Sequence, residues 1–393
     1  MDDLLRWRAH FPILDRTTYL ISNSLGAMPA AASTSLGEYT GQWGERGVRA
    51  WAETWWGLPR VFGDRLAMLL GARPDTISMH LNVTLASAVV VSCLDFSGRR
   101  NKVVYSDMNF PSLHYLYTRH AQARVVTVPT RDGISVPLGE LVDAIDDETL
   151  LVPISHVLFR SAYIQDVAAV VEKARRVGAL VLLDVYQSAG TLPLDLERLG
   201  VDFAVGGTLK WLCGGPGVAF LYVRPDLIEA LEPRLTGWLA HPEPFAFELA
   251  AMRYAEGSYR FMSGTPNIPG LYAARPGLEI LLEAGIEPIR AKSMRQTERL
   301  IERARGLGLE VTAPDKPDER GGTVAVQLPE AYAVSRELLA RDVIVDYRPQ
   351  AGIRLSPHFY TTDEELDHAI DQVGEILRSR AHERHIGAKG VVT

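Results

Sequence analysis

The fold is decided by the stretch Ala179-Leu180-Val181-Leu182-Leu183-Asp184, which is followed by Val201-Asp202-Phe203-Ala204-Val205-Gly206-Gly207-Thr208-Leu209-Lys210. Each half begins as a short apolar run of the length expected for a buried parallel strand. The first run ends in a carboxylate, and the second ends in a Gly-Gly pair that is expected to turn the chain and release Lys210. Because open α/β sheets bind ligands at the carboxyl ends of parallel strands, we expect Asp184 and Lys210 to face one crevice.

A lysine amine and a carboxylate at neighbouring strand ends are the pair that pyridoxal 5'-phosphate (PLP) chemistry uses. The lysine forms a Schiff base with the aldehyde of the cofactor, and the carboxylate holds the pyridinium nitrogen protonated so that the ring accepts electrons. Taken singly, a strand-end aspartate is often a helix cap, and a lysine after Gly-Gly is often a solvated loop residue. The pair therefore takes its meaning from the residues around it.

The totals of the chain exclude several other classes of protein. Its 393 residues exceed one typical core, and 47% hydrophobic against 23% charged residues excludes a largely disordered chain. A net charge of −7 argues against sequence-independent binding to nucleic acid or to an anionic membrane. The longest apolar runs stay below the ~18 residues of a membrane span, and Met1-Asp2-Asp3-Leu4 does not resemble a signal peptide. Cys93 and Cys213 have neither disulfide nor metal-ligand spacing, so we expect a reduced, cytoplasmic compartment and no metal site.

Alternating apolar strands and amphipathic helices predict an α/β fold. Between residues 60 and 284 the pattern indicates a large domain with a mainly parallel, seven-stranded sheet covered by helices. Residues 285–378 change to shorter strands between helices, which predicts a smaller α+β domain. Residues 1–59 form an N-terminal segment, and residues 379–393 lack an apolar period and are expected to be a frayed tail.

Several residues around the central pair are candidates for binding the cofactor. The junction His80-Leu81-Asn82-Val83-Thr84 follows a strand and opens a helix, so Leu81, Asn82 and Thr84 are placed to bind a phosphate, although an ordinary helix cap explains them equally well. Thr208 can direct a hydroxyl toward the same phosphate. Phe110 lies just past the strand 102–106 and is the candidate for a flat partner of the cofactor ring, with simple packing as the alternative.

A substrate carboxylate needs a planar cation, and Arg354 is the candidate. It lies in Gly352-Ile353-Arg354-Leu355-Ser356-Pro357, on an expected strand of the smaller domain with apolar neighbours. An arginine in such a place needs a partner, which is either a bound carboxylate or a structural salt bridge. The sequence leaves these two alternatives open.

These residues together resemble fold-type-I PLP enzymes of the class V aminotransferase family, and most of all its kynureninase branch. The resemblance extends over nearly the whole chain and rests on short motifs in a shared order. They are Asn23-Ser24-Leu25-Gly26, the run from Trp43-Gly44-Glu45 to Trp56-Gly57-Leu58-Pro59, Asn109-Phe110-Pro111, Ser155-His156-Val157, Asp184, the run from Gly207 to Gly217 around Lys210, Gly237-Trp238 with Pro244-Phe245-Ala246-Phe247, Ser263-Gly264-Thr265-Pro266-Asn267-Ile268-Pro269, and Arg354.

The resemblance implies a function for each matched position. Lys210 and Asp184 would be the catalytic pair, Phe110 would stack on the cofactor, and Trp238 would contact its phosphate. Thr265 would reach the phosphate bound in a neighbouring subunit, which implies a homodimer with shared active sites, and residues 1–59 would pack with the small domain and at the dimer interface. Arg354 would bind the carboxylate of an L-amino acid substrate, with Asn23 and Ser24 beside it.

Four positions, at three places in the chain, depart from the kynureninase pattern. Gln187 stands three residues after the aspartate where kynureninases have histidine; it can donate to the ring oxygen of the cofactor but is neither acid nor base near neutral pH. Leu209 replaces a phosphate-binding tyrosine, and Leu158-Phe159 replaces Asn-Tyr. These changes remove polar groups that hydrolytic cleavage of kynurenine would use.

The expected function is therefore that of a PLP-dependent enzyme acting on an L-amino acid through Lys210, of the kynureninase-like or aminotransferase type. A β-eliminating C–S lyase is the alternative reaction. A non-catalytic binding protein on the same fold is a weaker alternative, since Lys210 is present. A cofactor-free acyl transferase lacks support, because no Gly-x-Ser-x-Gly elbow follows a strand.

Overall fold

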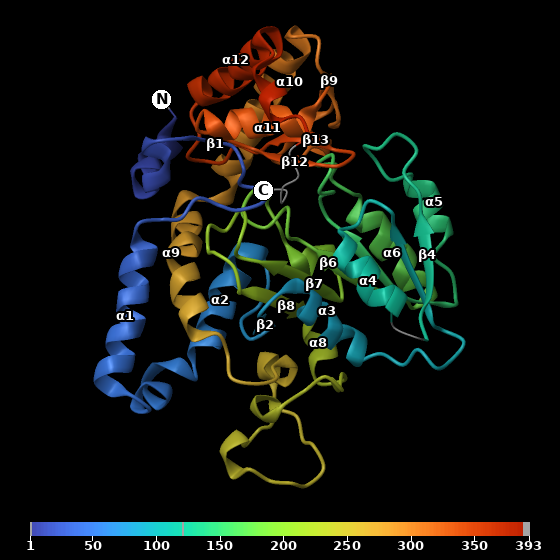
Figure 1. Cartoon of the computed structure of the whole chain (residues 1–393). Coiled ribbons are helices and arrows are strands. Elements are labelled where there is room, and N and C mark those ends of the chain that lie inside the picture. Colours follow the sequence, from blue (N-terminus) through green and yellow to red (C-terminus); the bar gives the residue numbers. More distant parts are fainter. Residues whose placement is uncertain (1, 120–121, 388–393) are drawn as a thin grey trace.

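The computed structural model describes residues 2–119 and 122–387, and a seven-stranded sheet runs through its larger lobe (Figure 1). The strands lie in the order β2-β8-β7-β6-β5-β3-β4. All pairings from β4 to β7 are parallel, whereas β8 is antiparallel to both β7 and β2. The prediction of a mainly parallel seven-stranded sheet is confirmed. Its strands are β2 (Ile77–His80), β3 (Lys102–Ser106), β4 (Arg124–Val128), β5 (Thr149–Ser155), β6 (Leu180–Asp184), β7 (Phe203–Gly207) and β8 (Ala219–Val223).

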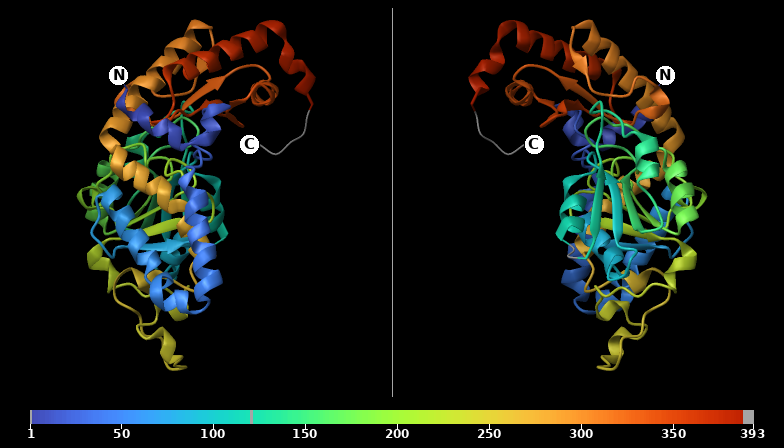
Figure 2. Two further views of the ribbon diagram at one scale, coloured as in Figure 1. Left: turned by 90° about the vertical axis from the view of Figure 1, so that its left-hand side faces the viewer. Right: turned by 90° about the vertical axis from the view of Figure 1, so that its right-hand side faces the viewer.

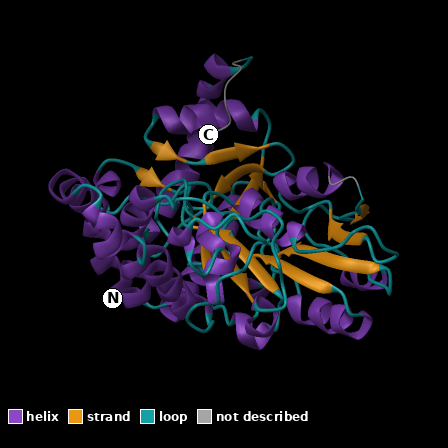
Figure 3. Cartoon of the chain, turned by 90° about the horizontal axis from the view of Figure 1, so that it is seen from below, coloured by secondary structure: helices purple, strands orange, loops and turns teal. Residues whose placement is uncertain are grey.

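Both faces of the central strands are buried, which is why these strands are apolar runs without alternation. In β6, Leu182 packs with α3 and α4 on one face of the sheet, and Leu183 packs with α2, α6 and α9 on the other. Figure 3 shows helices on both sides of the strands. The helices of this lobe are α2 (Leu58–Leu70), α3 (Val83–Ser92), α4 (Pro111–Arg119), α5 (Leu138–Asp143), α6 (Val167–Val177), α7 (Leu196–Leu199), α8 (Pro225–Ile228) and α9 (Ile268–Ala284).

A second, antiparallel sheet forms a smaller lobe with its own core (Figure 2). Its strand order is β12-β13-β10-β9, and α10, α11 and α12 cover it. The bounds are β9 (Glu310–Val311), β10 (Val324–Gln327), β12 (Asp346–Arg348), β13 (Gly352–Leu355), α10 (Ile286–Gly306), α11 (Ala331–Ala340) and α12 (Asp363–Ser379). The domain boundaries at residues 60, 285 and 379 stay predictions.

The N-terminal segment connects the two lobes. After η1 (Asp3–His10) and η2 (Pro12–Asp15), strand β1 (Thr18–Tyr19) pairs in parallel with β11 (Val343–Ile344) of the smaller lobe. The turn that follows is bonded at both ends: the Ser22 N–H donates to Ser356 O at 3.4 Å, and the Gly26 N–H donates to Leu209 O at 2.9 Å. Helix α1 (Ala31–Arg46) then packs along α9, and the π-helical turn η3 (Trp51–Trp55) leads into α2.

The structure differs from the sequence expectation in two places. Gly206 and Gly207 are not a turn: they are the last two residues of β7, and neither has a positive φ. Residues 381–385 are not frayed but form a 3-10 helix, η8 (Ala381–His385), because Arg384 and His385 bond to the buried carboxylate of Glu337 at 2.7 and 3.0 Å. The remainder of the expected tail, residues 388–393, lies outside the described residues.

The segment between α8 and α9 is the least regular part of the larger lobe. Short 3-10 helices punctuate it, and its middle protrudes from the body of the protein at the bottom of Figure 1. These helices are η4 (Trp238–Ala240), η5 (Pro244–Ala246) and η6 (Gly257–Phe261), and a further one, η7 (Pro317–Glu319), lies in the smaller lobe. Among residues 2–119 and 122–387, none of the helices combines the length and apolar character needed to span a bilayer.

Candidate active site

A cavity of about 230 Å³ lies at the carboxyl ends of β5, β6 and β7, where the sequence predicts the crevice. Asp184 and Lys210 both line it. The parallel register sets Asp184 beside Ser155 of β5 and Val205 of β7, so the carboxylate leaves the sheet at its centre. The N-terminal ends of α3 and α4 form the opposite wall. Asp184 and Lys210 therefore share one cavity, as the sequence predicts.

Asp184 is the last residue of β6 and is 7% exposed. Its Oδ1 accepts a hydrogen bond from the Tyr186 N–H at 2.9 Å. Burial raises the pKa of the carboxyl group, while the Tyr186 N–H and the charge of Lys210 oppose that shift. A buried carboxylate with one bonded oxygen is suited to accept a further hydrogen bond from a protonated ring nitrogen.

The amine of Lys210 is held between charged and aromatic groups. Its Nζ lies 4.4 Å from the ring centroid of Tyr186 and 5.8 Å from that of Phe110. Burial lowers the pKa of Lys210 to about 8, with Arg354 adding to this effect and Asp184 opposing it. An amine with such a pKa is neutral in an appreciable fraction of molecules near pH 7, so it is available as a nucleophile and as a base.

The N-terminus of α3 offers an anion site at the edge of the cavity. Asn82 caps this helix by accepting the Leu85 N–H at 2.9 Å, and Asn82, Val83 and Thr84 line the cavity. Free N–H groups and the helix dipole favour a phosphate there. Leu81, 53% exposed, instead lines another cavity. The Thr208 hydroxyl approaches the carbonyls of Gly215 and Val218, both at 3.3 Å, so its proton is used inside the protein.

Phe110 and Gln187 lie on the cavity as expected. Phe110 meets Phe159 edge to face, with ring centroids 5.4 Å apart. The Gln187 amide is fixed by two hydrogen bonds: its Nε2 donates to Asn23 O at 3.0 Å, and its Oε1 accepts from Trp211 Nε1 at 2.9 Å. These bonds orient the amide and leave one N–H of Nε2 for a ligand.

Arg354 forms a structural salt bridge, and its guanidinium still has N–H groups that could bind a carboxylate. Asp346, fully buried, accepts Arg354 Nε at 2.8 Å and Nη2 at 2.5 Å, and Phe159 O accepts Nη1 at 2.6 Å. A guanidinium carries five N–H groups, so two remain, one on each Nη. Arg354 does not line the cavity among the described residues, but its charge lowers the pKa of Lys210.

The substrate candidates of the N-terminal turn lie beside this cluster. Asn23 is 1% exposed, and its side-chain nitrogen and oxygen have no hydrogen-bond partner in the described part of the chain. Its backbone oxygen accepts the bond from Gln187, which places it behind the cavity. Ser24 Oγ accepts from Arg348 Nη2 at 3.4 Å. A buried amide without a partner is unfavourable, and a bound carboxylate or amine would supply one.

Three residues at the site were missed from the sequence. Asp346 and Arg348 complete the cluster around Arg354. The signal in the sequence was that Asp346 and Arg354 stand on either side of the turn Pro349-Gln350-Ala351-Gly352, so that a hairpin places these two residues opposite each other. Asp346 pairs with both arginines, at 3.3 Å for Arg348 and 2.5 Å for Arg354, so the cluster of one carboxylate and two guanidinium groups keeps a net positive charge. The third, Tyr186, lies between Asp184 and Gln187 and had no motif to identify it.

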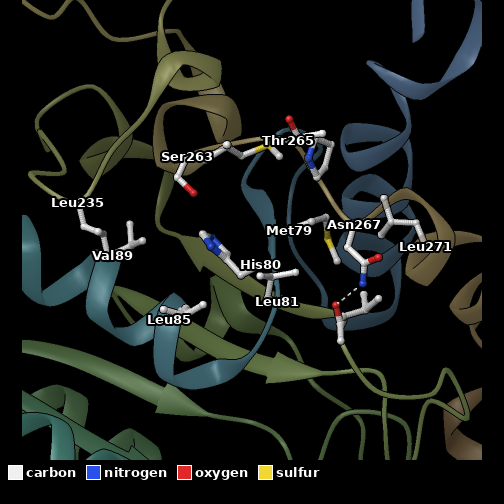
Figure 4. Close-up of a pocket in the computed structure, with 15 residues that line it drawn as sticks. Met79, His80, Leu81, Leu85, Val89, Leu235, Ser263, Thr265, Asn267 and Leu271 are labelled. Atoms are coloured by element: carbon white, nitrogen blue, oxygen red, sulfur yellow. Dashed lines mark hydrogen bonds between the residues drawn. The ribbon is translucent and has the colours of Figure 1, made fainter. Parts of the chain in front are cut away.

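Trp238 and Thr265 do not join this cavity in the described chain. Thr265 lines a second cavity of about 280 Å³ together with His80, Ser263 and Asn267 (Figure 4). Trp238 packs edge to face against Trp56 and Phe245, with centroids 5.4 and 5.6 Å away. Within one chain, both residues therefore lie outside the lining of the Lys210 cavity.

The side chains present at the cavity fit PLP. A lysine amine, a buried carboxylate with a free oxygen, a helix N-terminus and an aromatic ring correspond to the aldehyde, ring nitrogen, phosphate and ring face of that cofactor. In the described residues no group of three or more His, Cys, Asp or Glu side chains has the arrangement of a metal site.

Comparison with known proteins agrees with this reading. The sequence model of the family described as aminotransferase class-V matches residues 62–368. An uncharacterized aminotransferase of Bacillus subtilis, YcbU, is 35% identical over 94% of this chain and 96% of its own length. A kynureninase of Burkholderia pseudomallei is 34% identical over 97% of this chain and 94% of its own.

Solved structures share the fold at lower identity. A cysteine desulfurase from Thermococcus onnurineus superimposes with a TM-score of 0.83 at 20% identity, covering 95% of this chain and 98% of its own. A cystine C–S lyase, C-DES, superimposes with a TM-score of 0.84 at 24% identity, covering 93% and 99%. The fold-type-I architecture expected from the sequence is confirmed.

Proposed function

Because the chain belongs to the aminotransferase class-V family, whose members use PLP, we propose that it carries this cofactor on Lys210 and acts on an L-amino acid. It is a PLP-dependent enzyme. The observation that supports the site assignment is the shared cavity of Lys210, with a pKa of about 8, and the buried carboxylate of Asp184.

The chemistry follows from these two groups. When bound, PLP supplies an electron-withdrawing ring that stabilises negative charge on the substrate Cα. Lys210 Nζ would remove the proton from that carbon and, for transamination, would pass it to the carbon that carried the cofactor aldehyde, because the neutral amine is populated near pH 7. Asp184 holds a proton on the ring nitrogen with the oxygen that Tyr186 leaves free.

The other residues bind and orient. The N-terminus of α3 with Asn82 and Thr84 holds the phosphate, and the remaining N–H of Gln187 bonds the ring oxygen. Arg354 has two N–H groups left that would serve the substrate carboxylate, and the buried Asn23 amide has no partner in the described chain. Phe110 and Phe159 line the cavity and pack edge to face, so they add apolar surface to its wall.

The protonation states favour transamination over hydrolytic cleavage. Burial raises the pKa of Tyr186 to about 12 and lowers that of the neighbouring His156 to about 4, so neither changes its protonation near pH 7. Gln187 and Leu209 cannot transfer a proton. Lys210 thus acts as a single base, which suffices for transamination. A single base also suffices for β-elimination, which is the second candidate reaction.

A substrate panel tests this proposal. The holoenzyme is incubated with amino acid and keto acid pairs, with kynurenine and with S-alkyl cysteines, and the products are identified as a new amino acid, anthranilate or pyruvate. We expect a new amino acid, whereas pyruvate from an S-alkyl cysteine would favour β-elimination. Anthranilate at a comparable rate would refute the argument from Gln187 and Leu209, and an unchanged absorption spectrum with every amino acid would refute the amino acid substrate.

We also propose that the protein is a homodimer in which Thr265 of each chain serves the cofactor of the other. Neither Thr265 nor Trp238 lines the Lys210 cavity of its own chain. Large apolar side chains near each of them are exposed, and a second copy would remove them from water: Leu81 53%, Leu85 41% and Leu235 43% at the cavity of Thr265, and Phe245 56% and Phe247 72% against Trp238.

Sedimentation should give twice the chain mass of 43.4 kDa. Thr265→Ala should weaken PLP binding while the Lys210 cavity within each chain is unchanged. A monomer that retains full PLP affinity would contradict this proposal. A cytoplasmic location fits the two unpaired cysteines, and cell fractionation that recovers the protein elsewhere would refute it.

A further inference from the structure

The Gly206-Gly207 pair serves a purpose other than the turn expected from the sequence. Both residues are extended at the end of β7. A Cβ on Gly206 would lie 2.5 Å from Phe220 Cζ, and a Cβ on Gly207 would lie 2.6 Å from the Tyr186 hydroxyl oxygen and 2.7 Å from its Cζ. Real Cβ atoms do not approach other atoms so closely. The missing side chain of Gly207 therefore leaves the space that the end of the Tyr186 side chain occupies.

The Tyr186 ring lies across the inner side of the active-site cavity. Its Cα follows β6, its hydroxyl reaches β7 at Gly207, and its ring centroid lies 4.4 Å from Lys210 Nζ. The hydroxyl makes no hydrogen bond within the described residues, and burial raises the pKa of the phenol to about 12, so it is neutral at pH 7. The hydroxyl thus does not draw the ring away from the cavity, where the ring faces the Lys210 amine.

Lys210 Nζ faces a second ring, that of Phe110, at 5.8 Å. Phe110 comes from the loop before α4, and Tyr186 comes from the end of β6, so two separate elements bring aromatic rings to one amine. A planar aromatic group bonded to that amine has both rings within reach, and stacked aromatic rings attract beyond the area that they bury. Among the described residues, Tyr186 is the only tyrosine that lines this cavity. The position before Lys210 is Leu209, which has no aromatic ring.

We infer that Tyr186 is a cofactor-positioning residue that forms the inner wall of an aromatic slot, opposite Phe110, with Gly207 as the space that this wall requires. This inference rests on the proposed function, because the slot holds the ring of PLP. When PLP is absent or released, the same ring lies against the freed Lys210 ammonium, which it attracts through a cation–π interaction.

Three variants of the holoenzyme test the slot: Tyr186→Phe, Tyr186→Leu and Gly207→Ala. The readouts are the dissociation constant of PLP and the absorption maximum of the bound cofactor. We expect Tyr186→Phe to bind within about twofold of wild type, because the ring remains, and Tyr186→Leu to bind about tenfold more weakly, as the loss of one aromatic pair implies. Gly207→Ala should weaken binding and shift the absorption maximum, because the added methyl group displaces the Tyr186 ring.

The matched control is Tyr115→Leu, which removes an exposed tyrosine of α4 from outside the cavity and should leave both readouts unchanged. Wild-type constants in Tyr186→Leu would overturn the inference, as would equal losses in Tyr186→Phe and Tyr186→Leu. A wild-type protein that binds no PLP would instead refute the proposed function, so the two failures are distinguishable. If Tyr186→Leu does not fold, Gly207→Ala with normal binding and spectrum overturns the inference on its own.

Discussion

Replacing Lys210 with alanine is expected to abolish turnover while the protein stays folded. Lys210 combines two functions in one side chain, since it is the only amine on the cavity in the described chain and its pKa of about 8 suits proton transfer near neutrality. Loss of a general base alone lowers rates by about 10²–10⁴-fold, and loss of the covalent attachment adds to this. We expect kcat to fall by at least about a thousandfold.

Stability should move little or rise in this variant. Burial disfavours the charged form of Lys210. Removal of the amine therefore removes a contribution that lowers the stability of the folded protein. Borohydride should fix PLP to the wild-type protein on Lys210 and should fix none to Lys210→Ala at the site. Lys316→Ala removes an exposed lysine and serves as the control with normal activity. Undiminished turnover in Lys210→Ala would refute the catalytic assignment.

The central sheet and the position of Asp184 could be predicted because burial on both faces leaves a direct record in the sequence. A strand such as β6 must be apolar up to its last residue, and the first polar residue, here Asp184, marks the carboxyl edge of the sheet. The same logic located Lys210 after β7. The parallel register then brings the two together without any information on side-chain contacts.

Contacts between distant segments were not predictable in the same way. Arg354 read equally well as a carboxylate site and as a salt bridge, because its partner Asp346 is fixed only by the register of β12 and β13. The pair Gly206-Gly207 suggested a turn, because a glycine can be required for two different reasons. It can allow a positive φ, or it can leave room for a close neighbour, and the sequence does not distinguish the two. Residues 381–385 read as frayed, because their order comes from Glu337 and not from an apolar period.

Thr208, Trp238 and Thr265 show the limit of reading motifs one position at a time. A motif places a residue type at a chain position, but the proton of Thr208 is used by two carbonyls that follow it in the loop. Trp238 and Thr265 lie outside the cavity of their own chain, so their proposed role depends on a second copy. Tyr186 is the reverse case, because no motif identified it although it lies at the site. Its ring lies closer to Lys210 Nζ than the ring of Phe110 does.

Gly26→Ala is the second change with a large expected effect, and it acts on Lys210 from behind. A Cβ on Gly26 would lie 2.1 Å from the carbonyl oxygen of Lys210 and 2.9 Å from Cys213 Cα. Both are backbone atoms, so the clash cannot be relieved by a side-chain rotation, and the loop that carries Lys210 must shift. Overpacking of this kind costs about 1–3 kcal/mol of unfolding free energy.

Thermal unfolding and PLP content measure this effect. We expect Gly26→Ala to unfold at a lower temperature and to retain less PLP than wild type. Gly41→Ala is the matched control: it lies in α1, a Cβ there meets nothing within 4 Å, and the helix should gain up to about 1 kcal/mol. Wild-type stability and PLP content in Gly26→Ala would show that the Lys210 loop is not held in the described conformation.

The two readouts also separate packing from positioning. The turn from Ser22 to Gly26 is bonded to Ser356 at one end and to Leu209 at the other, and its Ser24 bonds to Arg348 in between. A displaced turn would therefore move the carboxylate-binding cluster relative to the lysine as well as strain the loop. If the turn only fills space, KM for the amino acid should stay constant while the unfolding temperature falls. If it sets the distance between Lys210 and the arginines, KM should rise even at temperatures where the variant is fully folded.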